Sequence, residues 1–565
     1  MNENYLKWLN ENDLDKSLQN ELNAMDDAQI EEAFYKHLSF GTGGMRGIIG
    51  AGTNRMNIYT IRKAVYGYAK FLLEYYDNVA SRGVVIAYDN RHNSQVFAKE
   101  CVGVLSSFGI KTYLFENIRP TPLLSFSVRA KEAAGGIMVT ASHNPPNYNG
   151  IKMYDDDGCQ LVPKLADRVI DYVNGVEDLF AIKTLTFEEA EEKNLVEMLG
   201  RDLDNMYLQD VYSIQLQQDV KKSLKIVFTP LHGASREIGL RSLVENDYKV
   251  FPVESQMVAD PDFKTVKSPN PEDPKAFDEA VKIGLEHQAD ILIATDPDGD
   301  RLGVAVYHDK TYKFLTGNQT GAIFIDYLLS HKKVTNDLPN HGVIYNTIVT
   351  NNFGEEIAKA YGVEVISTLT GFKFIGEQIK KIEDTEKTFL MGYEESYGYV
   401  LKDSVRDKDS IQAMVLISEI ANELKQQGKT LYDYLLELYD QYGAWRDKLV
   451  NIVLEGKEGE GKIKAIMNYF RGYTPQTLLD KKLLIKEDYL HGIRYVGDEQ
   501  ESMNFPESNV LKFVFEDFWF VLRPSGTEPK LKIYLVHKGK TVKEADQVLE
   551  SIQTVLTDLI DSINE

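Results

Sequence analysis

Residues 135–152 read GGIMVTASHNPPNYNGIK, and this stretch indicates both the fold and the chemistry. Its apolar run, Ile137–Val139, predicts the end of a buried strand, and Pro145 and Pro146 stop regular structure soon afterwards. Polar loops at the end of such strands are where α/β proteins place their chemistry. Ser142 is therefore a candidate functional residue, although an ordinary turn is the alternative interpretation because Ser, Asn, Pro and Gly are common turn residues.

Length, charge and cysteine content limit the class of protein. The chain has 565 residues, which predicts three to five domains. Its net charge of -23 argues against a nucleic-acid or anionic-membrane partner, since both need a basic face. Only two cysteines occur, Cys101 and Cys159, and no run is apolar and long enough to span a membrane. We expect a cytoplasmic protein without a secretory signal.

Strand and helix patterns alternate along most of the chain. Helical patterns over residues 58–76 and 94–108 flank GVVIAYDNR, residues 83–91, an apolar run that ends in polar residues. Such alternation predicts parallel sheets. Four later strands also end in polar residues, within 223–233, 289–301, 342–351 and 388–399.

Changes from helical to strand-led segments predict domain boundaries near residues 205, 315 and 440. The last domain differs, because residues 509–517, 518–527 and 530–539 are strand patterns with little room for helices between them, so antiparallel pairing is expected. A final helix is expected to begin with a capping box, Thr541 with Glu544. The predicted domains are 1–204, 205–315, 316–440 and 441–565.

Three carboxylates follow the predicted strand Ile291–Ala294. Asp296, Asp298 and Asp300 stand at alternate positions of DPDGDR, where they can converge on one hard cation, and Mg²⁺ prefers oxygen ligands. A calcium-binding EF-hand is excluded, since Arg301 occupies the position of its glycine. The alternative is an acidic surface turn, but the position after a buried strand favours a metal site.

The segment RPSGTEPK, residues 523–530, is a candidate phosphate-binding loop. One guanidinium, two hydroxyls and the amides around a glycine can surround a phosphate dianion. It is not a Walker A loop, and a plain hairpin turn between two strands is equally compatible with the residues alone.

Further polar segments are less specific. TGFK at 370–373, EES at 394–396 and RDKD at 406–409 can each be solvated loops, and His232 can be a structural histidine. Ser142 and His143 do not indicate a hydrolase, because Thr140 and Asn144 stand where a nucleophile elbow needs glycine. Adjacent residues are also not expected to form a serine–histidine couple.

Taken together, FGTGGMRG, TASHNPPNYNG, DPDGDR, GYEESYG and RPSGTEPK resemble, in this order, the α-D-phosphohexomutase family, and most of all its phosphoglucomutase branch. The resemblance spans nearly the whole chain. It implies an α/β fold, with three related α/β domains with mixed sheets and a smaller α+β C-terminal domain around a central cleft.

The resemblance also implies roles for individual residues. Ser142 would carry a phosphoryl group, and that group with the three aspartates, Asp296, Asp298 and Asp300, would bind Mg²⁺. The other implied catalytic residues are Arg46, His143, Lys152, Arg301 and Lys408, among which Lys152, Lys408 and His143 are alternative general bases. The implied substrate-binding residues are Thr370, Gly371, Lys373, Glu394 and Ser396 for the sugar, and Arg523, Ser525, Gly526 and Thr527 for the phosphate that does not react.

The activity implied is the interconversion of glucose 1-phosphate and glucose 6-phosphate through glucose 1,6-bisphosphate. Phosphomannomutase, phosphopentomutase and sugar-bisphosphate synthase activities remain alternatives, since one hydroxyl distinguishes hexose epimers. A non-catalytic sugar-phosphate-binding relative is a further alternative. The expected partner is a sugar phosphate, and the expected state is a monomer or weak homodimer.

Overall fold

The computed structural model describes residues 2–39, 44–454, 456–525 and 530–563. The chain divides into two compact units. The first contains residues 1–320, 339–343 and 372–431, and the second contains residues 321–338, 344–371 and 432–565.

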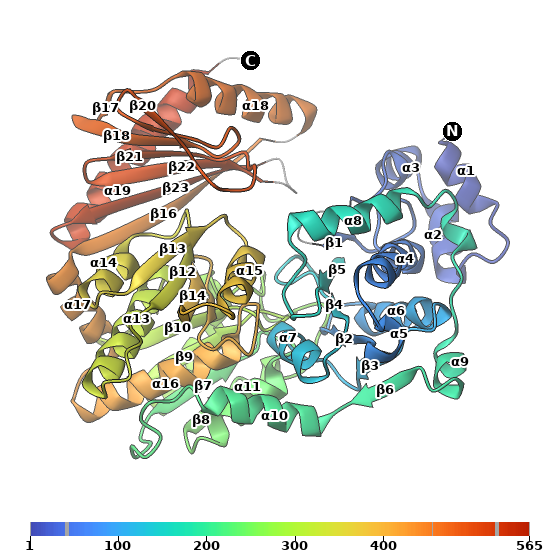
Figure 1. Cartoon of the computed structure of the whole chain (residues 1–565), viewed down its shortest axis with the longest axis horizontal. Coiled ribbons are helices and arrows are strands. Elements are labelled where there is room, and N and C mark those ends of the chain that lie inside the picture. The colour runs from blue at the N-terminus through green and yellow to red at the C-terminus, as the bar shows by residue number, and fades with distance from the viewer. Residues whose placement is uncertain (1, 40–43, 455, 526–529, 564–565) are drawn as a thin grey trace. The chain divides into compact units, whose positions relative to one another are not determined.

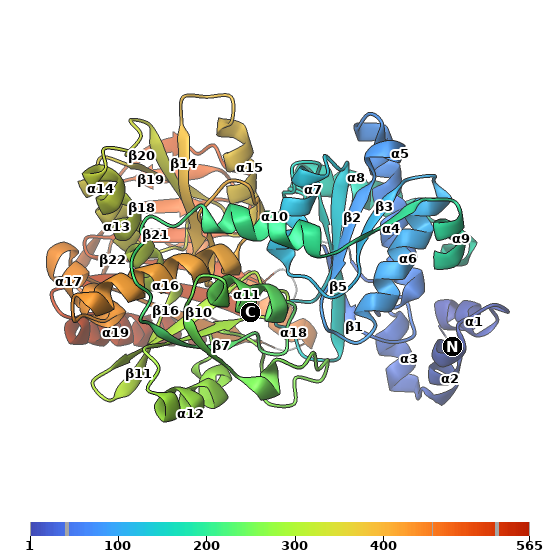
Figure 2. The ribbon, with the colours of Figure 1, turned by 90° about the horizontal axis from the view of Figure 1, so that it is seen from below.

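Three short helices begin the first unit: α1 (Glu3–Leu9), α2 (Lys16–Ala24) and α3 (Asp27–Phe34). The side chains of Asn2, Asp15 and Asp26 accept hydrogen bonds from the first backbone amides of these helices, which explains where each begins. Trp8 packs edge to face on Phe34, and Figures 1 and 2 show the three helices gathered together.

A six-stranded sheet follows, in the order β1-β5-β4-β2-β3-β6. The strands β2, β3, β4 and β6 pair in parallel, as predicted, whereas β1 and β5 are antiparallel to their neighbours. β5 is antiparallel to β4 because only a short loop joins the two strands, and a parallel partner needs a long crossover connection. The strands are β1 (Met45–Ile48), β2 (Val84–Tyr88), β3 (Thr112–Phe115), β4 (Gly135–Val139), β5 (Tyr148–Tyr154) and β6 (Val196–Leu199).

Helices bury this sheet, so its strands read as continuous apolar runs. Alternate residues of β2 and β4, among them Ile86 and Ile137, share one core with α4 and α6. A Cβ on Gly136 would meet Val128 of α7, so α7 covers the other face. The helices are α4 (Ile58–Tyr75), α5 (Val79–Arg82), α6 (Ser94–Ser107), α7 (Thr121–Ala130), α8 (Pro163–Asn174), α9 (Phe187–Glu192) and α10 (Arg201–Tyr212).

The second sheet of this unit has the order β11-β10-β9-β7-β8. Pairs β7–β8 and β7–β9 are parallel, and β9–β10 and β10–β11 are antiparallel. Helix α16 (Ser410–Gln426) is buried along nearly its whole length, which marks it as a core helix. The other elements are β7 (Lys225–Thr229), β8 (Lys249–Pro252), β9 (Ile291–Thr295), β10 (Leu302–His308), β11 (Thr311–Leu315), α11 (Arg236–Val244), α12 (Asp278–His287) and α15 (Phe372–Ile382).

One local arrangement occurs three times in the first unit. A buried strand turns directly into an antiparallel partner, and the turn carries polar residues. The serine loop joins β4 to β5, the aspartate loop joins β9 to β10, and GYEESYG forms the turn from β14 (Thr388–Glu394) to β15 (Gly398–Val400). Three of the sequence motifs therefore lie on equivalent hairpin turns.

The second unit contains the C-terminal sheet, in the order β16-β23-β22-β21-β18-β19-β20, with β17 paired to β18. All these pairs are antiparallel, which confirms the prediction. Figure 1 shows α18 and α19 beside this sheet. Their side chains share one core with those of β21, β22 and β23. The strands are β16 (Ala444–Val453), β17 (Thr477–Leu478), β18 (Lys481–Asp488), β19 (Ile493–Val496), β20 (Glu499–Ser502), β21 (Leu511–Phe515), β22 (Phe518–Pro524) and β23 (Lys530–Gly539).

The last helix is capped differently from the prediction. Thr541 accepts a hydrogen bond from the Glu544 backbone amide, but the Glu544 carboxylate bonds the Lys540 amide rather than that of Thr541. Only one half of the capping box is therefore present. The helices α18 (Gly456–Gly472) and α19 (Val542–Asp561) belong to this domain, and the remaining elements are α13 (Gly317–Val334), β12 (Gly342–Thr347), α14 (Phe353–Ala360), β13 (Glu364–Thr368) and α17 (Leu431–Tyr442).

Candidate active site

Ser142 lies in a strained backbone conformation at the start of the serine loop. Its φ is 50°, in the left-handed region that non-glycine residues rarely adopt, and the residue is 2% exposed. The Ser142 amide donates to Thr140 Oγ1 at 2.8 Å, and that hydroxyl donates to Asp89 Oδ2 at 2.6 Å. Such strain persists only where the surroundings hold the residue in place, and it is frequent at functional sites.

Arg91 supplies that hold. Its Nη1 donates to the carbonyls of Pro145 and Tyr148 at 2.8 and 3.0 Å, and its Nη2 donates to the carbonyls of Ser142 and Asn144. The guanidinium is buried, and Asp89 lies 3.4 Å from it. Arg91 was not among the predicted site residues. The only signal in the sequence was its position at the polar end of GVVIAYDNR, the strand that neighbours β4.

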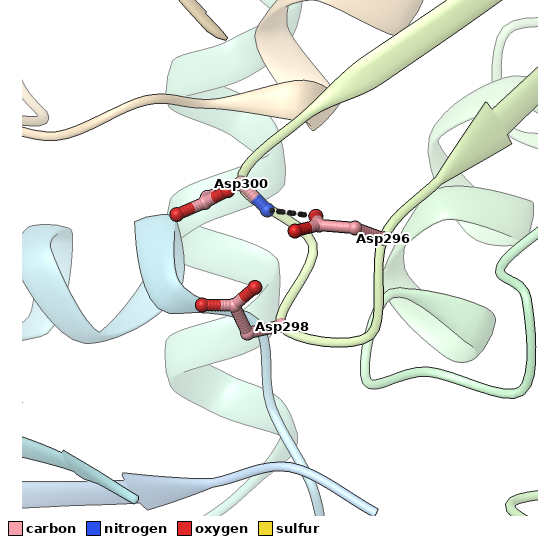
Figure 3. A group of neighbouring side chains, drawn as sticks. All are labelled: Asp296, Asp298 and Asp300. Atoms are coloured by element: carbon pink, nitrogen blue, oxygen red, sulfur yellow. Dashed lines mark hydrogen bonds between the residues drawn. The ribbon is translucent and has the colours of Figure 1, made fainter. Parts of the chain in front are cut away.

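The aspartate loop brings its three carboxylates together, as predicted (Figure 3). One oxygen from each of Asp296, Asp298 and Asp300 lies within 4.8 Å of the others, and all three residues are buried. Two backbone amides, of Asp300 and Arg301, donate to Asp296 Oδ1 at 3.1 and 3.0 Å. Gly299 has a φ of 65°, and a Cβ there would lie 2.7 Å from Pro120, so only glycine fits this turn.

The donor set of this group fits a hard divalent cation. Oδ1 of Asp298 and Oδ1 of Asp300 are buried and accept no hydrogen bond from any described residue. Buried carboxylate oxygens without donors are costly unless a cation neutralises them. All-oxygen ligands at this spacing suit Mg²⁺. An acidic surface turn, the alternative interpretation, is excluded for these residues because they are buried.

Ser142 joins this group directly. Its Oγ donates to Asp296 Oδ2 at 2.8 Å. Burial raises the pKa of Asp296, and the carboxylates of Asp298 and Asp300 raise it further. Burial also opposes ionisation of Asp298, but the charge and hydrogen bond of Lys152, a hydrogen bond with Asp296 and the charge of Lys408 together lower the pKa of that carboxyl. The serine hydroxyl and the metal-site carboxylates thus form one buried cluster.

Two lysines neutralise the cluster. Lys152 Nζ lies 2.7 Å from Asp298 Oδ2 and 3.2 Å from Asp300 Oδ2. Lys408 Nζ lies 3.1 Å from the same oxygen of Asp300 and 3.1 Å from Asp407 Oδ1. Burial opposes the charge of both lysines, yet the surrounding carboxylates raise the pKa of each. Both are therefore cations in this structure.

The remaining predicted catalytic residues surround the serine loop. Arg301 pairs with Glu272, and Arg46 Nη1 donates to Asn144 Oδ1 at 3.3 Å. Burial and the charges of Arg301 and Arg46 lower the pKa of His143, which is therefore neutral. Its Nδ1 lies 3.2 Å from Ser142 Oγ, but that hydroxyl donates to Asp296, so the two side chains touch without forming the serine–histidine couple of a hydrolase. The left-handed backbone of Ser142 brings the two side chains together.

The predicted sugar-binding residues belong to different units. Glu394 and Ser396 lie on the third hairpin of the first unit, where Ser396 Oγ is 3.5 Å from Glu394 Oε2, and Lys373 opens α15. Thr370 and Gly371 belong to the second unit. The Thr370 hydroxyl has no hydrogen-bond partner among the described residues.

The predicted phosphate loop belongs to the second unit. Arg523 stands near the end of β22, where its side chain is half-buried and Nη1 lies 3.4 Å from Tyr534 Oη. Ser525 follows, and its amide donates to the Lys530 carbonyl at 2.8 Å. Gly526 and Thr527 lie outside the described residues.

Several supporting residues were not anticipated. Thr121 Oγ1 donates to Asp298 Oδ2 at 3.1 Å, and Tyr154 Oη donates to Asp407 Oδ2 at 2.9 Å. Ser410 Oγ donates to the Gly299 carbonyl at 2.6 Å, which fastens the aspartate loop to α16. His232 contacts the Val258 carbonyl and the Thr265 hydroxyl, and is a structural histidine.

Sequence comparisons match nearly the whole chain to one family. The phosphoglucomutase/phosphomannomutase alpha/beta/alpha domains I, II and III match residues 37–179, 205–309 and 316–442, and the C-terminal domain of that family matches residues 478–554. A phosphoglucomutase of Staphylococcus haemolyticus is 40% identical, over 92% of this chain and 94% of that protein. A phosphoglucomutase of Staphylococcus aureus MRSA252 is 38% identical, over 94% of both chains.

Solved structures share the fold. A putative phosphomannomutase from Thermus thermophilus has a TM-score of 0.68 at 23% identity, and covers 92% of this chain and 99% of its own. The parafusin phosphoglucomutase from Paramecium also has a TM-score of 0.68, at 17% identity, with 94% and 95% covered. Along the parts of the chain that the structure describes, we find no helix with the length and apolar character to cross a bilayer.

The expected architecture, three α/β domains with mixed sheets and a smaller C-terminal domain, is thus confirmed, and so is the expectation of a mutase. This chain belongs to the phosphoglucomutase/phosphomannomutase family, the α-D-phosphohexomutases.

Proposed function

We propose that this mutase is a phosphoglucomutase that interconverts glucose 1-phosphate and glucose 6-phosphate. The observation that carries the proposal is the contact between Ser142 Oγ and Asp296 Oδ2, 2.8 Å, inside a buried group of three carboxylates. A serine beside a cation site can carry a phosphoryl group whose charge the cation balances. The relatives named phosphoglucomutase, at 38–40% identity over more than nine-tenths of the chain, support glucose as the sugar.

Mg²⁺ is the proposed metal. Asp296, Asp298 and Asp300 would hold it together with an oxygen of the phosphorylated Ser142. When bound, it would supply charge neutralisation for the phosphoryl group during transfer. The unpartnered oxygens of Asp298 and Asp300 support this assignment.

The chain's own residues complete the chemistry. Phosphoryl transfer breaks the bond between phosphorus and Ser142 Oγ and forms one between phosphorus and a hydroxyl oxygen of the sugar phosphate. Lys152, Lys408 and Arg301 are cations and neutralise charge near the transferring group. Lys152, Lys408 and His143 are the candidate acceptors of the hydroxyl proton; both lysines hold their protons, and His143 is neutral with its Nδ1 3.2 Å from Ser142 Oγ. The proton taken from the sugar hydroxyl is passed on to the seryl oxygen after the phosphoryl group has left, so that the step balances.

The intermediate is glucose 1,6-bisphosphate, which must turn end for end before it returns its other phosphate to Ser142. Arg46 would support the serine loop through Asn144. We assign the phosphate that does not react to Arg523, Ser525, Gly526 and Thr527, because a guanidinium, hydroxyls and amides suit a phosphate dianion. We assign the sugar hydroxyls to Thr370, Gly371, Lys373, Glu394 and Ser396.

Two measurements on the purified protein test this function. A coupled assay with Mg²⁺ and catalytic bisphosphate should show higher kcat/KM for glucose 1-phosphate than for mannose 1-phosphate or ribose 1-phosphate. Intact mass should show one phosphoryl adduct, absent from Ser142→Ala. A preference for mannose or ribose would reassign the sugar, release of free bisphosphate as the main product would indicate a synthase, and no turnover with no adduct would indicate a non-catalytic relative.

The domain boundaries at 205, 315 and 440, the central cleft, the cytoplasmic location and the monomer or weak homodimer remain predictions.

A further inference from the structure

Arg301, one of the cations of the active site, has a fixed backbone but a side chain with few partners. Its amide donates to Asp296 Oδ1 at 3.0 Å, which fixes its main chain beside the aspartate loop. The guanidinium pairs through Nη1 with Glu272, and its Nε lies 3.9 Å from Asp300 Oδ1. Among the described residues, no other carboxylate lies within ion-pair distance of it. A long, flexible side chain with one close partner depends on that partner for its position.

The charge of this guanidinium acts on the serine loop. After burial, it is the largest cause that lowers the pKa of His143, whose Nδ1 lies 3.2 Å from Ser142 Oγ. Burial opposes the charge of Arg301, and the Glu272 carboxylate is the largest of the charges that outweigh burial and raise the pKa of Arg301. Because electrostatic interactions weaken with distance, a displaced guanidinium would act less on a phosphoryl group carried by Ser142.

Glu272 lies outside every motif found in the sequence. It belongs to SPNPEDP, residues 268–274, in which three prolines restrict the backbone. The Asn270 side chain accepts a hydrogen bond from the Glu272 amide at 3.1 Å, and the Asn270 carbonyl accepts one from the Asp273 amide at 3.0 Å. The backbone of this turn is therefore held in place before the Glu272 side chain reaches Arg301.

The same turn packs directly on β10. A Cβ at Gly303 would lie 2.7 Å from the Pro271 carbonyl oxygen and 2.8 Å from the Pro271 Cβ, so only glycine allows this close approach. Gly303 stands two residues after Arg301. The strand that follows Arg301 therefore fixes the distance at which Glu272 meets the guanidinium.

We propose that Glu272 is a positioning residue for the mutase reaction, which holds the Arg301 guanidinium toward the phosphoryl group on Ser142. This inference rests on the proposed function, because phosphoryl transfer is what gives Arg301 a negative charge to neutralise. The charge of Glu272 itself does not favour a phosphate nearby. Its contribution comes from the fixed position of the guanidinium, since a charge that is already in place needs no reordering during the reaction.

Turnover of three variants, with the sugar phosphate that the wild-type chain prefers, tests the proposal. Glu272→Ala removes the charge and the hydrogen-bond acceptor, so kcat should fall about tenfold while KM stays within about twofold, because Arg301 is assigned to the transferring group. Glu272→Gln keeps an acceptor for the guanidinium and should recover part of the loss. The matched control is Asp273→Asn, since the Asp273 carboxylate accepts from the Lys275 amide at 3.0 Å and should leave kcat unchanged.

A double-mutant cycle separates positioning from simple support of the fold. In an Arg301→Met background, Glu272→Ala should lower kcat by less than about twofold, because no guanidinium is left to position. If Glu272→Ala does not fold, Glu272→Gln takes its place in the cycle.

The proposal is overturned if folded Glu272→Ala has the kcat of the control, if its loss is equally large in the Arg301→Met background, or if KM rises while kcat is unchanged. Absence of turnover in the wild-type chain would overturn the proposed function and this inference together. Wild-type turnover with an unchanged Glu272→Ala would overturn this inference alone.

Discussion

The residues assigned to phosphoryl transfer and the arginine assigned to the phosphate that does not react differ in how firmly their side chains are held. Ser142, Asp298 and Lys152 are buried, and each is held by partners from several elements. Arg523 is half-buried, and among the described residues its side chain makes one hydrogen bond, a long one to Tyr534. Reacting groups gain from preorganisation, because it removes the cost of ordering them during the reaction. A phosphate-binding site that must accept a sugar bisphosphate in two orientations benefits from side chains that can change conformation.

Ser142→Ala should have the largest effect. Without the seryl oxygen there is no phosphoryl carrier, so we expect turnover to fall at least a thousandfold, about 4 kcal/mol on the barrier, and the phosphoryl adduct to disappear. Kinetics and intact mass on one preparation measure both.

The matched control is Ser410→Ala, which removes a buried hydroxyl near the aspartate loop but no reacting atom. It should keep the adduct. Wild-type-like turnover of Ser142→Ala, purified free of host enzyme, would show that Ser142 does not carry the phosphoryl group.

Arg91→Lys tests whether the hold on the serine loop matters. One ammonium cannot replace a planar guanidinium that bonds four carbonyls, so the strained loop should lose its position while the charge opposite Asp89 is kept. We expect kcat to fall about thirtyfold, roughly 2 kcal/mol, with KM little changed because Arg91 touches no proposed substrate group.

Arg62→Lys is the control for this change, since it alters a partly exposed ion pair between Arg62 of α4 and Glu100 of α6. It should leave kcat as in the wild-type chain. A rise in KM without a fall in kcat would show that Arg91 acts on substrate binding instead.

Asp298→Asn should weaken the metal site. The amide removes one negative charge from the three-carboxylate group and leaves Lys152 with a weaker partner. We expect turnover to fall at least tenfold, about 1.4 kcal/mol, and the Mg²⁺ concentration for half-maximal activity to rise. An unchanged Mg²⁺ titration would mean that the buried carboxylates serve the fold alone.

The sequence predicts the residues with chemistry of their own better than the residues that hold them. Asp296, Asp298 and Asp300 could be grouped because alternate positions after a buried strand must lie close together. Arg91 could not be predicted as a site residue, because its partners are backbone carbonyls of a loop some 50 residues away. Every residue has a backbone carbonyl, so the residue types do not indicate which carbonyls Arg91 binds. The contact of His143 with Ser142 depends on a φ of 50°, which no residue pattern announces.

Sheet direction shows the same limit. Alternating strands and helices predict parallel pairing, and this is correct for β2, β3 and β4. The antiparallel turns after β4 and β9 depend on how short the connecting loops are, and proline and glycine in those loops were the available signal. The sequence therefore predicts the motifs, but not the hairpin turns on which they lie.

Arg523→Ala tests the other side of the comparison. A charge-assisted hydrogen bond contributes about 1.5–3 kcal/mol, so kcat/KM should fall about tenfold or more. Arg523→Lys should recover only part, because an ammonium cannot make a planar two-point contact with phosphate. The adduct on Ser142 should remain in both variants, as seen by intact mass. An unchanged kcat/KM in the alanine variant would mean that RPSGTEPK is a plain hairpin turn and does not bind phosphate.

The smallest effect concerns the helix that fastens the aspartate loop. Asp409 caps α16, where its Oδ1 accepts from the amides of Ile411 and Gln412 and from Tyr207 Oη, while its buried Oδ2 has no partner among the described residues. Burial raises the pKa of Asp409 to about 7, against an ordinary value of 3.8. Folding therefore favours the protonated form of the Asp409 carboxyl, beside the loop that holds the metal-site aspartates.

A raised carboxyl pKa means that the folded state binds the proton more tightly than the unfolded state. The stabilisation is therefore fully present below the unfolded pKa and is lost as the pH rises through about 7. About three pKa units correspond to an upper limit of roughly 4 kcal/mol. Asp409→Asn keeps an oxygen to cap α16 but cannot titrate, so local stability should fall less steeply with pH.

Hydrogen exchange of the α16 amides between pH 5 and 8, corrected for the intrinsic exchange rate, measures this slope. The wild-type chain should lose protection toward pH 8, and Asp409→Asn should lose less of it. Asp219→Asn, at an exposed position, should keep the wild-type slope. If the protection of Asp409→Asn and Asp219→Asn falls equally steeply with pH, Asp409 is already ionised in the folded protein. The stability of α16, which holds the aspartate loop, then does not depend on a buried proton.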